Sequence, residues 1–475
     1  MRKTKIICTL GPACKNEDTL TKMCLAGMNV ARLNFSHGTH EQHKEMIELI
    51  KKVREKLNVP IAIMLDTKGP EYRIKTFKDG KILLNDGDSF TFTTEDIVGD
   101  ETKVGVNYKG LINDLCVGDK ILVNNGLVSF EVKELSDNEA HCRVITGGEL
   151  SNQKSMSFPN KVLKQAFLSE QDKSDILFGI ENDIDYIAAS FVSSKQDMLD
   201  IKNFLDENGG SDIGLVAKIE NQSGVDNIYE ICEICEGVMI ARGDLGVEIP
   251  FQELPAVQKK LVTVCRMLGK RIITATEMLE SMIYNPRPTR AEISDVANAV
   301  YDGTSAVMLS GETAAGKYPV QTVQIMSSIC EETENHIHYD KRFHRSDFEI
   351  KSNIDAISHS ACSMALGVDA KAIAVCSLSG KTARLVSRFR PVVDIVGLTT
   401  SKRVWRKLAL SWGVIPVLCE EYPSAEVMFY SAARKTTKTL NLKSGDNIII
   451  VGGTTSGKSG ETNTIRLERV RGKQI

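Results

Sequence analysis

Leu215-Val216-Ala217-Lys218-Ile219-Glu220 is a short apolar run that ends in charged residues, and the same unit, followed by an amphipathic helical pattern, recurs along the chain. The runs are continuous rather than alternating in polarity, which is typical of parallel strands buried on both faces. Eight such strands alternating with helices predict an α/β fold built on a (β/α)8 TIM barrel. The predicted strands are Lys5–Leu10, Val30–Phe35, Ile61–Leu65, Tyr186–Phe191, Leu215–Ile219, Val238–Ala241, Arg271–Ala275 and Ala306–Leu309.

One long interval breaks this rhythm between Asp66 and a helix that begins near Ser169. It contains short alternating runs separated by Asp-Gly, Gly-Asp and Asn-Gly turns, a pattern that predicts hairpins. The clearest runs are Ser89–Thr94, Lys120–Val123 and Leu127–Val132. We therefore predict a small all-β barrel domain of residues 71–168, inserted after the third strand of a catalytic barrel made of residues 1–70 and 169–340.

A helix from about Pro319 to His336 ends the barrel, and the charged stretch Asp340–Lys351 predicts a linker. Further apolar runs then alternate with helices, which predicts an open C-terminal α/β domain of residues 341–475. Its predicted strands are Ala372–Cys376, Asp394–Leu398, Ile415–Leu418 and Asn447–Val451, followed by a last β-like run at Thr462–Val470.

The composition is that of an ordinary globular protein. The chain has 475 residues, which predicts two to four domains, and its formal net charge of -3 gives no global basic field for nucleic acid or a membrane surface. No apolar run is long enough to span a bilayer, and Ile6–Leu10 is too short for a signal peptide. The chain has twelve cysteines scattered along its length, a pattern that favours reduced thiols over a disulfide framework. We expect a cytoplasmic protein without nucleic-acid or membrane partners.

Cys232 and Cys235 form a lone Cys-x-x-Cys pair in a helical pattern. No second pair lies at zinc-site spacing, so buried thiols on one helix face are the better interpretation.

Polar residues gather where the predicted barrel strands end. Enzymes on this barrel carry their reactive groups at the carboxyl ends of the strands. Converging cations and carboxylates there indicate a metal ion that bridges an anionic substrate. The residues at these ends are Arg32, Asn34, Ser36, His37, Asp66, Thr67, Lys218, Glu220, Arg242, Gly243, Asp244, Thr276, Glu277, Ser310 and Glu312.

Lys218 and Glu220 lie two residues apart on one strand, so their side chains point the same way, and Asp244 enters from the neighbouring strand. Two carboxylates with open positions between them suit Mg²⁺, which keeps several waters. Taken alone, Glu220 and Asp244 could equally form structural ion pairs with Lys218 or Arg242. Because the other barrel strands also end in polar and charged residues, a metal site is the better interpretation of Glu220 and Asp244 than structural ion pairs.

Several segments resemble successive motifs of the pyruvate kinase family, in that family's order and spacing. The resemblance implies transfer of a phosphoryl group from phosphoenolpyruvate to ADP, giving pyruvate and ATP. The matching segments are Ala31-Arg32-Leu33-Asn34-Phe35-Ser36-His37-Gly38, Leu65-Asp66-Thr67-Lys68-Gly69-Pro70-Glu71, Lys218-Ile219-Glu220-Asn221, Ala241-Arg242-Gly243-Asp244-Leu245-Gly246, and the run from Met278-Leu279-Glu280-Ser281-Met282 to Gly311-Glu312-Thr313-Ala314.

The resemblance implies a role for each matching residue. Arg32 and Lys218 would hold the transferred phosphoryl group, and Glu220 and Asp244 would bind Mg²⁺ or Mn²⁺. The other roles it implies are a phosphoenolpyruvate carboxylate site of Gly243, Asp244 and Thr276; a K⁺ site of Asn34, Ser36, Asp66 and the Thr67 carbonyl; and nucleotide contacts from Asn34, His37, Arg73 and Lys173. It also implies a homotetramer.

Some positions depart from the family pattern. Glu277 stands where the family carries Gln and Ser305 where Asp is common, although neither replaces a direct ligand. Glu277 lies nearest the chemistry, on the side where enolpyruvate takes up its proton. We expect Thr276 with an ordered water, relayed through Ser310, to supply that proton.

Three other functions fit the sequence less well. Gly452-Gly453-Thr454-Thr455-Ser456-Gly457-Lys458-Ser459 matches the P-loop pattern, but the residues after it alternate like a strand and do not open a helix. A metal-dependent aldolase or lyase acting on pyruvate enolate would need no nucleotide-facing insert with Arg73 and Lys173. A catalytically silent metabolite sensor would not need Lys218, Glu220 and Asp244.

The C-terminal domain carries a candidate effector site in one turn. Ser377-Leu378-Ser379-Gly380-Lys381-Thr382 follows a buried strand and opens a predicted helix, Ala383–Phe389. Free backbone N–H groups, hydroxyls and Lys381 at a helix start favour a phosphorylated ligand. The residues we expect to bind it are Ser377, Ser379, Gly380, Lys381 and Thr382, and the alternative is a simple helix cap by Ser379.

Overall fold

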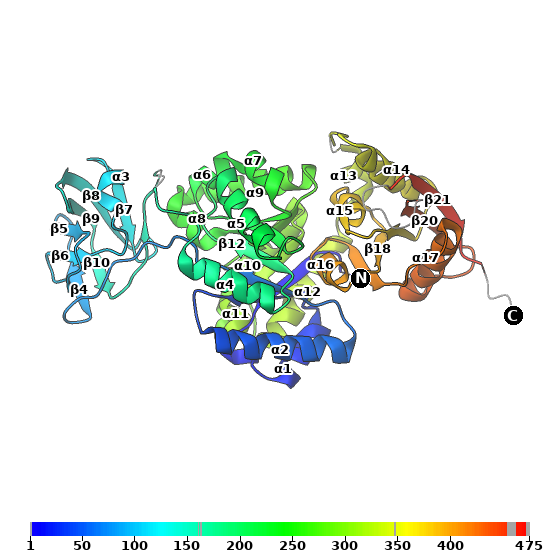
Figure 1. The fold of residues 1–475 in the computed structure, drawn as a ribbon, viewed down its shortest axis with the longest axis horizontal. Coiled ribbons are helices and arrows are strands. Elements are labelled where there is room, and N and C mark those ends of the chain that lie inside the picture. The colour runs from blue at the N-terminus through cyan, green and yellow to red at the C-terminus, as the bar shows by residue number, and fades with distance from the viewer. Residues whose placement is uncertain (1, 160, 162–163, 346–347, 454–461, 472–475) are drawn as a thin grey trace.

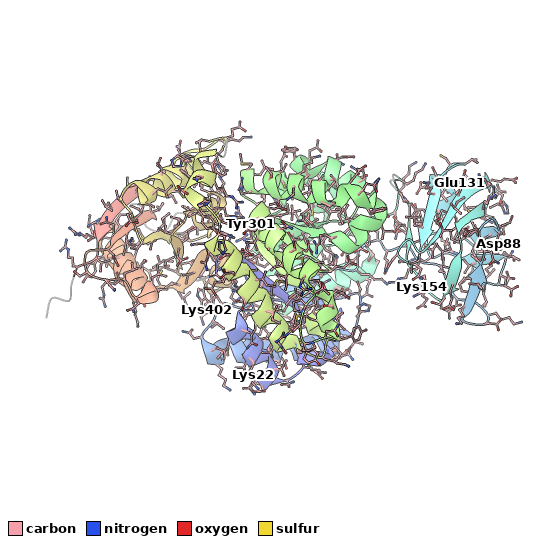
Figure 2. The ribbon with its side chains drawn as sticks, turned by 180° about the vertical axis from the view of Figure 1, so that it is seen from behind. Lys22, Asp88, Glu131, Lys154, Tyr301 and Lys402 are labelled. Atoms are coloured by element: carbon pink, nitrogen blue, oxygen red, sulfur yellow. The ribbon has the colours of Figure 1, made fainter. Side chains whose placement is uncertain are left out.

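The computed structural model describes residues 2–159, 161, 164–345, 348–453 and 462–471. Figure 1 shows three bodies in a row, with the barrel in the middle, an all-β domain at one end and a C-terminal α/β domain at the other. Figure 2 shows the same row from behind, with Asp88, Glu131 and Lys154 on the all-β domain. Among the described residues, no helix combines the length and apolar character needed to cross a bilayer.

Eight parallel strands close the barrel in the order β1-β16-β15-β14-β13-β12-β3-β2, which confirms the predicted TIM barrel. Side chains such as Met64 and Ile273 fill its interior, while Ile63 and Ile272 pack outward against the helices. Burial on both faces explains the continuous apolar runs. The strands are β1 (Lys5–Thr9), β2 (Val30–Asn34), β3 (Ala62–Asp66), β12 (Tyr186–Ala189), β13 (Gly214–Ile219), β14 (Gly237–Ala241), β15 (Arg271–Ala275) and β16 (Ala306–Leu309).

Helices surround the barrel strands, and several begin at capping boxes. Thr39 with Gln42 and Thr289 with Glu292 each satisfy backbone N–H groups at a helix start. The elements are η1 (Pro12–Cys14), α1 (Glu17–Ala26), α2 (His40–Leu57), α4 (Glu170–Glu181), α5 (Lys195–Glu207), α6 (Gln222–Asp226), α7 (Ile228–Ile234), α8 (Arg242–Glu248), η2 (Phe251–Glu253), α9 (Leu254–Met267), η3 (Glu280–Ile283), α10 (Arg290–Asp302), α11 (Gly311–Ala314) and α12 (Pro319–Asn335).

The described residues between β3 and α4 form strands and loops with one helical turn, which confirms an all-β insert. Its strands form a six-stranded sheet in the order β11-β7-β8-β9-β5-β6 and a two-stranded sheet of β10 and β4, where we had expected one small barrel. Phe90, Phe92 and Phe130 form the centre of its own core. The elements are β4 (Lys81–Leu84), β5 (Ser89–Thr93), β6 (Lys103–Gly105), α3 (Leu111–Asp114), β7 (Lys120–Val123), β8 (Val128–Leu135), β9 (Glu139–Thr146), β10 (Gly148–Ser151) and β11 (Met156–Ser157).

The C-terminal sheet has the order β19-β18-β17-β20-β21, with β21 antiparallel to β20. The predicted linker is wrong in part, because α13 occupies its first residues and buries Phe343 in the core of this domain. The elements are α13 (Tyr339–Arg345), α14 (Asn353–Gly367), β17 (Ala372–Cys376), α15 (Lys381–Arg388), β18 (Asp394–Thr399), α16 (Lys402–Leu408), β19 (Val414–Leu418), α17 (Ala425–Leu440), β20 (Asn447–Gly452) and β21 (Thr464–Arg469).

The C-terminal domain covers the amino-terminal end of the barrel. Asp185, which precedes β12, accepts a 2.7 Å hydrogen bond from Arg406 of α16, and Leu410 packs with the residues that fill the barrel. On the side of the barrel toward this domain, where Figure 2 labels Tyr301, the Tyr301 carbonyl accepts a hydrogen bond from Arg342 of α13. The carboxyl ends of the strands therefore lie at the opposite end, which the C-terminal domain does not cover.

Candidate active site

Four charged side chains meet at the carboxyl ends of β2, β3 and β13. Arg32 Nε donates to Asp66 Oδ2 at 2.6 Å, and Lys218 Nζ donates to Asp66 Oδ1 at 3.0 Å. Lys218 Nζ also lies 3.0 Å from Glu220 Oε1. All four residues are buried. The cluster balances two cations against two carboxylates, which is the condition for burying charges at tolerable cost.

The strand pairing explains this convergence. β2 and β3 run parallel with Asn34 opposite Asp66, so Arg32 and Asp66 leave adjacent strands at the same end of the barrel. Lys218 and Glu220 are separated by one residue, so their side chains share a face. The predicted convergence of Lys218 and Glu220 is thus present in the structure.

Asp66 and Lys218 are each stabilised in the ionised form by the charges around them. Burial works to raise the pKa of Asp66, but Arg32 and Lys218 outweigh it and hold that pKa below its ordinary value. Burial works to lower the pKa of Lys218, but Asp66 and Glu220 raise it above the ordinary value. Lys218 is therefore a permanently charged ammonium group at neutral pH.

Glu220 and Asp244 differ in their surroundings. Burial raises the pKa of the Glu220 carboxyl to about 7 despite the opposing effect of Lys218, and the Phe191 N–H donates to Glu220 Oε2 at 2.5 Å. Asp244 is exposed in the first turn of α8, and within the described ranges its carboxylate makes no ion pair. The structural pairing we weighed holds for Glu220 with Lys218 but not for Asp244 with Arg242, since Arg242 pairs with Asp295 at 2.8 Å.

Arg242 organises the end of β15 instead. Its guanidinium donates to the Thr276 carbonyl at 2.7 Å and to the Glu277 carbonyl at 3.2 Å. Thr276 and Glu277 have φ of 68° and 52°, a left-handed conformation that costs non-glycine residues about 1–3 kcal/mol each. The Gly243 N–H donates to Thr276 Oγ1 at 2.9 Å, so Thr276 and the start of α8 lie together as predicted.

The oxygen-rich residues after β2 and β3 surround the same end of the barrel. Asn34 Oδ1 accepts from the Ser36 N–H at 3.2 Å, while Ser36 and His37 are exposed. The His37 carbonyl lies 2.8 Å from His43 Nε2, and the His43 ring stacks on Phe35. Thr67 is buried. The loop that carries His37 is thereby fixed to α2.

Arg73 lies in the segment that leads into the all-β domain, and Lys173 lies in the first turn of α4, the barrel helix that follows this domain. Arg73 pairs with Glu71 and donates to the Gln153 carbonyl at 2.5 Å, and Lys173 pairs with Glu170 at 2.7 Å. In the part of the chain that the structure describes, neither side chain contacts the cluster of Arg32, Asp66, Lys218 and Glu220. The structure does not bring these two predicted nucleotide contacts together with the cluster.

Glu312 and Ser310 behave differently from the other strand ends. Glu312 is fully buried and accepts from the Ser310 N–H at 2.6 Å and the Leu279 N–H at 3.1 Å. Burial raises its pKa. Glu312 therefore fixes the loops after β15 and β16.

Two polar contacts of the cluster were missing from the prediction. Ser190 directly follows β12 and accepts from Lys218 Nζ at 2.6 Å, and Thr9 at the end of β1 accepts from Arg32 Nη1 at 2.8 Å. The predicted strand Tyr186–Phe191 enclosed Ser190 as an interior residue. Applying the strand-end rule to the first and fourth strands would have found both residues.

The Cys232 and Cys235 pair is buried, as the sequence predicts. However, α7 ends at Ile234, so Cys235 follows the helix instead of lying on its face. No group of three or more His, Cys, Asp or Glu with metal-binding geometry occurs in the described ranges. A metal held by Glu220 and Asp244 would therefore need water and substrate oxygens to complete its shell.

The predicted effector turn opens α15, which begins at Lys381, two residues earlier than expected. Gly380 is its N-cap with φ of 74°, and no side chain caps the helix, so the alternative of a Ser379 cap is wrong. Thr382 Oγ1 lies 2.7 Å from Thr462 Oγ1. Residues 454–459 of the P-loop-like segment lie outside the described residues, and the chain that follows forms strand β21.

Comparison with known proteins identifies the family. Residues 1–323 match the pyruvate kinase barrel domain, and residues 355–468 match the pyruvate kinase alpha/beta domain. The chain belongs to the pyruvate kinase family. It is 44% identical over 472 residues to the pyruvate kinase of Clostridium acetobutylicum, covering 99% of this chain and 100% of that one. It is 45% identical to the pyruvate kinase of Staphylococcus aureus, covering 99% of this chain and 81% of that one.

A solved structure agrees with these matches. The crystal structure of a pyruvate kinase from Cryptosporidium parvum superposes with a TM-score of 0.94 at 36% identity, covering 98% of this chain and 96% of that one. As a pyruvate kinase, the chain is a glycolytic phosphotransferase that moves the phosphoryl group of phosphoenolpyruvate to ADP, and its substrates are phosphoenolpyruvate or pyruvate and ADP or ATP. The aldolase or lyase alternative has no support.

Proposed function

We propose that the strand-end cluster carries out this phosphoryl transfer, with Arg32 and Lys218 binding the transferred group. The observation that carries the proposal is that both cations are held on one buried carboxylate, Asp66, at 2.6 and 3.0 Å. Phosphoryl transfer depends mainly on positioning and charge neutralisation, and prepositioned cations supply both. Lys218 would stabilise the charge that develops in the transition state.

The donor chemistry of Glu220 and Asp244 fits a hard divalent cation. Both offer carboxylate oxygens, and Asp244 is exposed and free of an ion pair within the described ranges. Oxygen ligands with open positions suit Mg²⁺ better than softer metals, and Mn²⁺ accepts the same set. We assign these two residues as its protein ligands. When bound, the ion would act as a Lewis acid toward a phosphoryl or carbonyl oxygen.

A monovalent cation fits the neighbouring oxygens. Asn34, Ser36, Asp66 and the Thr67 carbonyl offer only neutral or singly charged oxygens at the ends of β2 and β3. Asp66 already faces Arg32 and Lys218. We propose that these four residues hold K⁺.

The end of β15 suits the carboxylate of phosphoenolpyruvate. Thr276 Oγ1 and the N–H groups of Gly243 and Asp244 lie together there, and the first N–H groups of α8 have no acceptor within the helix. The proton that completes pyruvate would come from a water at Thr276, relayed through Ser310.

The all-β domain would close over the nucleotide. Arg73 lies in the segment that leads into this domain, Lys173 lies in the barrel helix α4 that follows it, and Asn34 and His37 lie at the barrel end that it would cover. We propose that these four residues contact ADP or ATP. Arg73, which the insert carries, makes no contact with the strand-end cluster in the described residues, as a lid in an open position would leave it.

The remaining assignments concern regulation and organisation. The side-chain-free cap of α15 leaves backbone N–H groups available beside Lys381, which supports a phosphorylated effector bound by Ser377, Ser379, Gly380, Lys381 and Thr382.

Separate hydrophobic cores support a barrel of residues 1–70 and 169–340, an insert of 71–168 and a C-terminal domain of 341–475. Twelve free thiols support a reducing cytoplasm. By family resemblance we propose a homotetramer.

Substitution of Arg32 tests the proposed cluster. Pyruvate formation is followed by lactate dehydrogenase and NADH in Mg²⁺ and K⁺. Arg32→Met should lower kcat/KM by about 10²-fold or more, because a charged hydrogen bond to the transition state is lost. Arg143→Met, which removes an exposed arginine of β9, is the matched control. An Arg32→Met enzyme with wild-type kcat/KM would exclude Arg32 from phosphoryl binding.

A further inference from the structure

Ser190 links two groups to which separate roles are proposed above. It directly follows β12, and the residue is 2% exposed. Its hydroxyl oxygen lies 2.6 Å from Lys218 Nζ and 2.7 Å from the Thr67 carbonyl oxygen. A longer contact of 3.3 Å reaches Asp66 Oδ1.

The direction of these hydrogen bonds is fixed by chemistry. An ammonium group can only donate, and a carbonyl oxygen can only accept. The Ser190 oxygen therefore accepts from Lys218, and its single hydroxyl proton goes to the Thr67 carbonyl at 2.7 Å, which is nearer than Asp66 Oδ1 at 3.3 Å. Successive hydrogen bonds in one direction polarise one another, so the two contacts strengthen each other.

The backbone around Ser190 leaves little freedom. The Ser190 N–H donates to Thr67 Oγ1 at 3.1 Å, and the Thr67 N–H donates to the Ala188 carbonyl at 3.0 Å. Gly69 has φ of 68°, and a Cβ at that position would lie 2.8 Å from Ser190 Cβ. The segment of Thr67 and Gly69 is therefore packed directly against Ser190.

We propose that Ser190 is a positioning residue that couples the monovalent-cation site to Lys218. Its hydroxyl holds the Thr67 carbonyl oxygen and the Lys218 ammonium group in one fixed relation, so a change at either is transmitted to the other. The inference rests on the proposed roles of the Thr67 carbonyl as a K⁺ ligand and of Lys218 in phosphoryl transfer. A residue that only filled space would not link the response to K⁺ with turnover.

The test compares Ser190→Ala with Ser190→Thr, which keeps the hydroxyl. A hydrogen bond to a charged group contributes about 1.5–3 kcal/mol, equivalent to about 10- to 100-fold in a rate or binding constant. In the full-length enzyme with Mg²⁺, Ser190→Ala should lower kcat by that factor and raise the half-saturating K⁺ concentration about 10-fold. The KM for ADP should change less than about 2-fold. Ser190→Thr should recover most of both losses.

A second readout does not depend on activity. The melting temperature is titrated with KCl at constant ionic strength, with choline chloride as the balancing salt. The K⁺ midpoint of the stabilisation should shift upward in Ser190→Ala and return in Ser190→Thr. Ser193→Ala is the matched control, because Ser193 lies in the same loop and its hydroxyl accepts from Asn221 instead.

The possible outcomes distinguish failure of the proposed coupling from failure of the proposed K⁺ site. A wild-type enzyme that shows no response to K⁺ in activity or melting would remove the proposed cation site and the coupling with it. A K⁺-dependent wild type together with a Ser190→Ala variant of unchanged kcat and K⁺ midpoint would overturn the coupling alone. A lower kcat with an unchanged K⁺ midpoint in both readouts would also overturn it, leaving Ser190 to orient Lys218 only.

Discussion

Lys218 Nζ lies 3.0 Å from Glu220 Oε1, and the two residues are 8% and 1% exposed. This buried pair joins the residue proposed to stabilise the transition state to a residue proposed to bind the divalent metal. Breaking a buried pair by removing one partner costs about 3–5 kcal/mol, because the other charge stays buried without compensation. Substitutions at either residue therefore affect both stability and catalysis, and the two effects must be measured separately.

Lys218→Met is expected to lower kcat by about 10²- to 10³-fold or more, because the charge aimed at the transition state is lost. The variant should also melt at a lower temperature than wild type, since Asp66 and Glu220 lose a partner. Steady-state kinetics at a temperature well below melting separates the two effects. Lys22→Met, on the exposed face of α1, is the control. Retention of more than about a tenth of wild-type kcat would exclude Lys218 as the transition-state cation.

Glu220→Gln and Asp244→Asn are each expected to raise the Mg²⁺ concentration needed for half-maximal activity by about 10-fold or more. Each removes an anionic ligand from a site with only two proposed protein ligands. Asp244→Asn is the cleaner test, because Asp244 makes no ion pair in the described ranges. Glu230→Gln, an exposed change on α7, is the control. Unchanged Mg²⁺ dependence in both variants would mean that Glu220 and Asp244 do not bind the metal and that Glu220 only forms an ion pair with Lys218.

Activity is expected to require K⁺. Removing the monovalent cation takes a positive charge away from the end of the barrel where the phosphoryl groups of phosphoenolpyruvate and ADP would bind. Replacing KCl by tetramethylammonium chloride at the same ionic strength should reduce kcat/KM by about 10-fold or more. Full activity in the organic salt would contradict the proposed site of Asn34, Ser36, Asp66 and Thr67.

The effector turn is tested with fructose 1,6-bisphosphate, ribose 5-phosphate, glucose 6-phosphate and AMP. At least one compound should raise the melting temperature and change the affinity for phosphoenolpyruvate. Ser379→Glu should abolish this response, because its carboxylate repels phosphate at the start of α15. Ser424→Ala, which removes the N-cap of α17, is a control for general effects on the domain. A response that survives Ser379→Glu, or no response to any compound, would place regulation elsewhere.

Glu236 joins the barrel to the C-terminal domain and gives a pH-dependent stability. Burial works to raise its pKa, but Lys407, Arg271 and Arg384 together lower the pKa to about 2. The pKa of a Glu in the unfolded chain is about 4.3. The contribution of Glu236 to folding stability is therefore complete above that pH and is lost as the pH falls toward the pKa of Glu236 in the folded protein. The side chain is 32% exposed, which limits the effect to about 1 kcal/mol.

Glu236→Gln is therefore expected to lower the melting temperature by up to about 4 °C at pH 7. The difference from wild type should stay constant from pH 8 to about pH 5 and narrow below that. Melting curves of both proteins at pH 7, 5 and 3 check this trend, with Glu230→Gln as a pH-independent control. A difference that widens toward pH 3 would contradict the assigned charge network.

The amino-acid sequence by itself determined the order of the elements and the family. The eight barrel strands lie within about two residues of their predicted bounds, because burial on both faces leaves a continuous apolar run that is visible locally. The insert was visible because its alternating pattern and turns differ from the rest. The clearest runs correspond to β5, β7 and β8, whereas the pairing of β4 with β10 into a separate two-stranded sheet depends on contacts between distant residues. The motifs from Ala31–Gly38 to Gly311–Ala314 then gave the family and its chemistry.

Only the tertiary structure decided which side chains meet. Asp66 contacts Lys218, which lies 152 positions away in the chain. In the closed barrel only β12 separates β3 from β13, so the side chains at the ends of these two strands converge. Arg242 could have paired with Asp244 two positions away, yet it pairs with Asp295 on α10. Such partners are set by closure of the barrel and by helix packing, which bring distant segments together. Strand periodicity is a local property of the chain, whereas these contacts depend on the register between strands.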